Sequence, residues 1–138
     1  MKVTFKTSDL KVKALDADNW ELLEPLVAEI DDNGVLRLVV VPGGFRTDFE
    51  SVPKALFLAY LLIKGRARMA ATLHDYLLDV IHGKLPNQTR PTTILLGMTP
   101  DRKWIDSVFY EAMKAEKTPW YARELAYAGV SAYSIVAK

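Results

Sequence analysis

The sequence predicts a single α+β domain spanning residues 1–138, in which antiparallel strands come first and about four helices follow. Two changes along the chain predict this class. Residues 1–45 contain apolar runs and alternations with the period of strands, whereas residues 53–136 carry apolar side chains at helical spacings. A chain of 138 residues can bury one core but seldom two, so both parts are expected to share it.

The strand region is expected to contain a hairpin over about residues 23–41. Two β-rich runs, LEPLVAEI and VLRLVVVP, flank a turn sequence that ends in Asn33-Gly34. An Asn-Gly pair suits the positive φ angles of a tight hairpin turn. The opening KVTFK alternates polar and apolar residues and predicts another strand, and FRTDFESVP after the hairpin reads as an irregular segment.

The helical region should begin near Pro53, where the apolar period changes. We expect helices over about 53–63 and 66–81, the second ending at a glycine cap. A proline-rich excursion follows, with a short strand at 93–96. A third helix should then open with Pro100 in its first turn and Asp101 complementing its positive end, and a fourth should cover about 120–136.

Composition removes several classes of function. The 18 Lys and Arg residues nearly balance the 17 Asp and Glu residues, so the chain has no overall positive field to gather nucleic acid. It has no cysteine, which leaves oxygen atoms and histidine as the only metal ligands. The longest apolar run, ALFLAYLLI, is far shorter than the roughly 20 residues that a membrane span needs, and the N-terminus lacks the pattern of a secretory signal.

Four residues are candidates for chemistry: Asp48, the adjacent pair His74 and Asp75, and Asp106. Neighbouring residues on a helix point about 100° apart, so His74 and Asp75 can border one cleft without facing the same neighbour. If the second and third helices pack antiparallel, Asp106 can hydrogen-bond one ring nitrogen of His74. The other nitrogen can then take a proton from water, and Asp75 can bind a hard cation.

Each candidate also has a structural interpretation. His74 can be a core histidine satisfied by one hydrogen bond, and Asp75 can be a salt-bridged carboxylate. Asp106 can pair with Arg102 or Lys103 on its own helix flank. Asp48 can cap the helix that follows it. Whichever interpretation holds, we predict a hydrogen bond between His74 and Asp106, because both are polar residues that interrupt apolar helix faces.

Three segments of the chain stand out together: GGFRTDFESVP, AATLHDYLLD and PDRKWIDSVFYEAMK. In this order they resemble the 1353 family of domains of unknown function, which is common in tailed-phage and prophage genomes. The second and third segments are also distantly similar to phospholipases A2. In those enzymes a His-Asp pair on one helix is matched by an aspartate on the facing helix. The resemblance implies that His74 is the base, Asp75 a calcium ligand and Asp106 the group that orients the histidine. Apart from the resemblance, Asp48 is a candidate to hold the cation together with Asp75.

These resemblances lead to two functional expectations. The first is a phage or prophage component of the virion, its tail or its assembly, or a host-directed binding protein, with the His-Asp-Asp set as a polar network. Its partners would be phage structural proteins or a host protein, and it would be made in the host cytoplasm and incorporated in the virion. The alternative is a calcium-type ester hydrolase acting on a lipid or other ester, with His74 as general base.

Overall fold

The computed structural model describes residues 1–16, 19–47, 67–82 and 100–136. The helix expected at 53–63, the strand expected at 93–96 and Asp48 lie outside these residues. The described part is α+β, with strands first and helices after them, as the sequence predicts.

The N-terminal strands form two small antiparallel sheets. The first has the order β1-β4-β5 and consists of Lys2–Phe5, Leu26–Asp32 and Val35–Val41. The second has the order β2-β3-β6 and consists of Val12–Ala14, Trp20–Leu22 and Arg46–Thr47. Strand β6 corrects one expectation, because the beginning of the segment predicted to be irregular pairs with β3.

The hairpin and its turn are confirmed. β4 and β5 pair in one continuous register, from Leu26 opposite Val41 to Asp32 opposite Val35. The two loop residues both have positive φ, 54° at Asn33 and 90° at Gly34, as a tight hairpin turn requires. The Asp31 side chain fixes the turn further by accepting a hydrogen bond from the Gly34 N–H at 2.9 Å.

Three helices lie in the described residues, where the sequence predicted about four in the whole chain. They are α2 (Arg68–His82), α3 (Arg102–Ala115) and α4 (Trp120–Val136), and they match the second, third and fourth expected helices. The start of α3 differs from the prediction. Asp101 is its N-cap and accepts the Trp104 N–H at 2.8 Å, so Pro100 precedes the cap and is not in the first turn.

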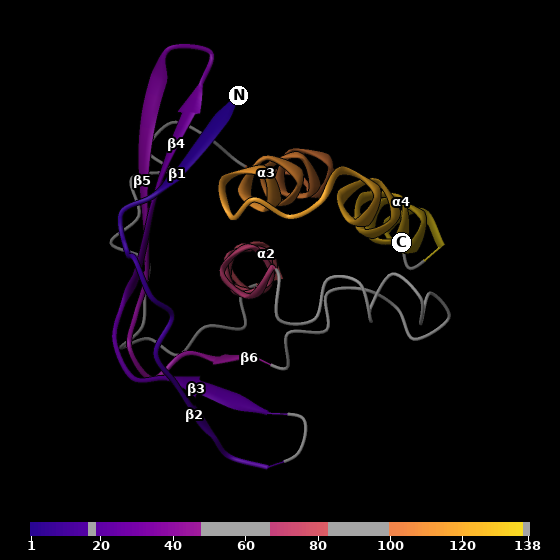
Figure 1. Ribbon diagram of the computed structural model, residues 1–138. Helices are drawn as coiled ribbons and strands as arrows, with labels where there is room; N and C mark the ends of the chain where they lie inside the picture. The colour runs from indigo at the N-terminus through magenta and orange to yellow at the C-terminus, as the bar shows by residue number, and fades with distance from the viewer. Residues whose placement is uncertain (17–18, 48–66, 83–99, 137–138) are drawn as a thin grey trace.

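Helices α2 and α3 lie on the same side of the sheets, and α4 packs against α3 away from them (Figure 1). The Trp104 indole N–H donates to Asp32 at 3.0 Å and ties α3 to the end of β4. Seven of the fifteen residues of α2 are buried, including the small Ala70 and Ala71. This helix is therefore covered on several sides, which places its central residue His74 in the core. None of the helices in the described ranges is long and apolar enough to cross a membrane.

Candidate functional site

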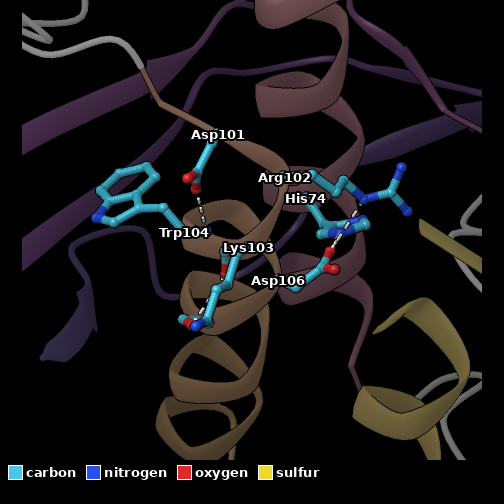
Figure 2. Close-up of polar contacts among 7 residues, drawn as sticks. His74, Asp101, Arg102, Lys103, Trp104 and Asp106 are labelled. Atoms are coloured by element: carbon cyan, nitrogen blue, oxygen red, sulfur yellow. Dashed lines mark hydrogen bonds and ion pairs between the residues drawn. The ribbon is translucent and has the colours of Figure 1, made fainter. Parts of the chain in front are cut away.

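The centre of the candidate site is a buried hydrogen bond between α2 and α3. The His74 Nε2 atom lies 2.8 Å from the Asp106 Oδ1 atom, and the two residues are 0% and 2% exposed. The Phe109 ring, one turn further along α3, packs on the imidazole with its centroid 4.8 Å away. The predicted pairing of His74 with Asp106 is confirmed, and it joins the two helices at the point where their apolar faces are interrupted (Figure 2).

Asp106 has a second partner on its own helix. The Arg102 Nε atom donates to the same Oδ1 atom at 3.2 Å, one helical turn before Asp106 (Figure 2). The pairing with Arg102 that the sequence offered as an alternative therefore occurs together with the pairing to His74. An aspartate that is almost fully buried needs such compensation, because a buried carboxylate without partners is strongly disfavoured.

The two ring nitrogens of His74 have different surroundings. Because an ionised carboxylate can only accept hydrogen bonds, we assign the hydrogen of a neutral His74 ring to Nε2, which leaves a lone pair on Nδ1. Nδ1 is buried and has no hydrogen-bond partner in the described part of the chain. Most buried polar atoms are paired, so an open nitrogen at this position calls for an explanation.

Asp75 points to a different neighbour from His74, as their adjacent positions on one helix predict. Its Oδ2 atom accepts a hydrogen bond from the Thr47 hydroxyl at 2.6 Å, which links α2 to strand β6. Thr47 directly precedes Asp48 in the sequence, so this bond connects the Thr-Asp-Phe motif to the His-Asp motif. The described residues thus join His74 to Asp106 and Asp75 to Thr47 in two separate contacts.

The predicted cation site is not visible as a cluster. Calcium takes six to eight oxygen ligands. Within the residues that the structure describes, no group of three or more His, Asp or Glu side chains is arranged to hold a metal ion. Asp75 alone does not make such a site, and Asp48, its predicted co-ligand, is not among the described residues. The roles of both aspartates as cation ligands remain predictions.

Glu116 is a half-buried acid that the sequence did not single out. It follows α3 and accepts the Ala70 N–H at 2.6 Å, in the first turn of α2. Helix α2 has no acidic residue of its own in that turn, and a Glu116 carboxyl oxygen accepts one of the N–H groups that a helix N-terminus leaves without a partner inside the helix. Burial nevertheless raises the pKa of Glu116 to about 7, against the lowering effect of its bonds to the Ala70 and Met69 N–H groups.

A separate pocket of about 300 Å³ lies by α3 and α4, and none of the predicted site residues lines it. The Tyr110 hydroxyl donates to Glu124 at 2.6 Å there, and this hydrogen bond raises the pKa of Tyr110. The Tyr110 and Tyr127 rings meet edge to face at 5.3 Å. Tyr110 thus contacts both Glu124 and Tyr127, and the pocket does not include the buried His74–Asp106 pair, so we place the candidate site at His74. The pocket is lined by Met1, Ser107, Tyr110, Glu111, Glu124 and Tyr127.

Fold and site together define a small α+β protein built around a buried histidine-aspartate pair between two helices. A family model described as "Protein of unknown function (DUF1353)" matches residues 20–130. The chain belongs to this family. No curated protein and no solved structure matches the chain.

Two contacts of the site were missed in the sequence for different reasons. Thr47 is 28 residues from Asp75, and no local pattern predicts a bond between them. Glu116 lies 46 residues from Ala70, and its role is visible only once α2 is known to lack an acid in its first turn. The missing acid in the first turn of α2 is the one sequence signal that predicts a hydrogen-bond acceptor from another segment at this helix end.

Proposed function

We propose that this protein is an ester hydrolase in which His74 takes a proton from water at Nδ1. One observation carries the proposal: Nε2 of the buried ring is held by Asp106, while Nδ1 has no partner in the described residues. A general base needs this combination of one fixed nitrogen and one open nitrogen. The distant similarity of the His-Asp and Asp motifs to phospholipases A2 supports a lipid or related ester as the substrate.

The chemistry assigned to the pair is general-base hydrolysis. The oxygen of a water molecule forms a bond to the ester carbonyl carbon as its proton moves to Nδ1, and the carbonyl electron pair moves onto oxygen. When the tetrahedral intermediate collapses, the bond to the alcohol oxygen breaks, and that oxygen takes the proton from Nδ1. Asp106 stabilises the transient imidazolium and keeps the ring in one orientation. Its ion pair with Arg102 holds the carboxylate in place.

Access to the imidazole is part of the proposal. His74 has no exposed surface, so water and substrate reach Nδ1 only when the side chains around the ring move. The described residues do not form a cation site, and the hydrolysis above needs only His74, Asp106 and Arg102. If Asp75 binds calcium as predicted from the sequence, the ion would stabilise negative charge on the carbonyl oxygen.

A second function is favoured by a different observation. Leu36 and Leu38 project from β5 with 64% and 41% exposure, in an apolar surface of the kind that contacts other proteins. Together with the similarity of the three motifs to a family common in phage genomes, this supports a component of the virion, its tail or its assembly. In that function the His74–Asp106–Arg102 network only fixes the packing of α2 on α3, and the partners are phage structural proteins or a host protein.

The test compares His74 with the other histidine. In His74→Gln the amide N–H can still donate to Asp106, but no base remains, whereas His82→Gln changes an exposed histidine at the end of the same helix. Hydrolysis is measured with phospholipid vesicles and with a soluble nitrophenyl ester, and circular dichroism checks folding. We expect His74→Gln to lose activity by about 10²-fold or more, as the loss of a general base does, and His82→Gln to retain it.

Two results would overturn the hydrolase proposal. One is a folded wild-type protein that cleaves neither ester in the presence or absence of calcium. The other is a folded His74→Gln variant that hydrolyses as fast as wild type. Either result leaves the binding function as the better account of the same buried network.

A further inference from the structure

Strand β5 forms one edge of the sheet β1-β4-β5, and among the described strands only β4 pairs with it. The two-residue turn makes Asp32–Val35 the first hydrogen-bonded pair of the hairpin, and such pairs recur at every second residue. The residues of β5 between these pairs therefore direct their backbone N–H and C=O groups away from β4. They are Leu36, Leu38 and Val40.

The side chains of the same three residues lie on the sheet face opposite the core. Leu36 and Leu38 are exposed and Val40 is half-buried, whereas Val39 and Val41, which alternate with them, are fully buried. The backbone edge of β5 that no described strand pairs with is therefore bordered by a continuous apolar row. We call Leu36, Leu38 and Val40, with their outward backbone groups, the β5 edge.

Strand β5, as the described residues show it, has none of the devices within a strand that natural proteins use to keep an edge strand unpaired. Such edges usually carry proline, lysine or a bulge, or are very short. Strand β5 has seven residues, contains neither proline nor lysine, and pairs with β4 without a bulge. Its single charge, Arg37, belongs to the other sheet face, so it does not interrupt the apolar row.

We propose that β5 pairs antiparallel with β5 of a second copy of this chain, about a two-fold axis at Leu38. A strand is the occupant that satisfies the backbone donors and acceptors of β5 with which no described strand pairs, and a two-fold interface uses the same patch on both copies. The β1-β4-β5 sheet of one copy and the β1-β4-β5 sheet of the other then become one continuous sheet of six strands.

The position of the axis follows from the strand itself. With Leu38 opposite Leu38, Leu36 lies opposite Val40 and all seven residues of β5 overlap. Centres at Leu36 or Val40 would instead bring the turn or Pro42 into the ladder and shorten it. The same register places Arg37 opposite Val39, so that the two arginines do not face each other directly.

Sedimentation velocity from low to high micromolar protein tests this interface. We expect wild type to pass from monomer to dimer as its concentration rises, and Leu38→Lys to stay monomeric, because two lysines would face each other at the axis. The matched control is Leu125→Lys on α4. It makes the same change at a leucine of the same 41% exposure, and it should dimerise like wild type.

Amide hydrogen exchange by NMR gives a second, residue-specific measurement. The amides of Leu36, Leu38 and Val40 should become protected as the protein concentration rises, whereas those of Arg37 and Val39, already bonded to β4, should be protected at every concentration. A wild type that stays monomeric throughout, or a Leu38→Lys variant that dimerises as well as Leu125→Lys does, overturns the proposal. The proposal is also overturned if the amides of Leu36, Leu38 and Val40 exchange equally fast at all protein concentrations.

Discussion

The energetic coupling between His74 and Asp106 can be worked out from the structure and measured. His74→Ala removes a fully buried ring from its contact with Phe109, and truncating a large buried side chain to alanine destabilises by about 2–4 kcal/mol. It also takes one hydrogen-bond donor from a buried carboxylate, which adds about 1 kcal/mol because Arg102 still pairs with it. We therefore expect a loss of about 3–5 kcal/mol in the free energy of unfolding.

Asp106→Asn keeps the shape of the side chain and one acceptor but removes its charge. The His74 hydrogen bond then changes from charge-assisted to neutral, and Arg102 loses its carboxylate, so we expect a loss of about 1–3 kcal/mol. In the double variant His74→Ala/Asp106→Asn, the first substitution has already removed the hydrogen bond between the two residues. The free energy of unfolding of the double variant should therefore fall by about 1–2 kcal/mol less than the sum of the two single losses.

The assay is urea unfolding followed by circular dichroism and by tryptophan fluorescence. Trp104, which lies on α3 and is bonded to the end of β4, contributes to that signal together with Trp20 and Trp120. His82→Ala is the control, an exposed histidine of the same helix whose replacement should change stability by about 0.5 kcal/mol or less. Single losses that add to the double loss within about 0.5 kcal/mol would refute the coupling. The slope of the transition should stay constant across the variants, which shows that only stability has changed.

Three further outcomes are expected. Gly34→Ala should destabilise by about 1 kcal/mol because its φ is 90°, while Gly43→Ala, where an added Cβ would meet only ordinary contacts, should be tolerated; urea midpoints compare the two. Burial raises the pKa of Glu116 from 4.5 to about 7, so the folded state favours the protonated carboxyl. The stability gained from this protonation is complete below pH 4.5 and is lost as the pH rises through 7. Between those pH values the free energy of unfolding of wild type should fall by up to about 3 kcal/mol relative to that of Glu116→Gln. If Asp75 binds calcium, the ion at about 100 times its dissociation constant should add about 2.7 kcal/mol to wild type and nothing to Asp75→Asn; equal melting temperatures with and without calcium would contradict that role.

Local features of the fold could be predicted from the sequence because their causes are local. The Asn33-Gly34 pair sets the hairpin turn, and the apolar period sets helix α2. The bond between His74 and Asp106 was predictable for a different reason. Each is a polar residue on a helix face that is otherwise apolar, and each needs a partner at the same depth in the core.

What the sequence did not predict depends on contacts between distant segments. The division of the strands into two sheets is decided by which strands meet, and β6 joins β3 over more than twenty residues. The bond from Thr47 to Asp75 follows from that arrangement, because β6 carries Thr47 to the side of α2. No periodicity within either segment encodes this neighbour.

The shared oxygen of Asp106 explains why stability alone cannot distinguish the two proposed functions. Both the His74 and the Arg102 contacts end on Oδ1, so the carboxylate fixes the helices together whether or not the histidine performs chemistry. A structural network and a catalytic pair therefore predict the same coupling energy. The two functions differ in what they require of Nδ1, the other ring nitrogen of His74. Nδ1 makes no hydrogen bond to the described residues, so it does not hold the helices together in that way. His74→Gln is informative for this reason: it preserves the donor to Asp106 and removes only the open base, so a large loss of hydrolysis in a folded variant would report chemistry at Nδ1.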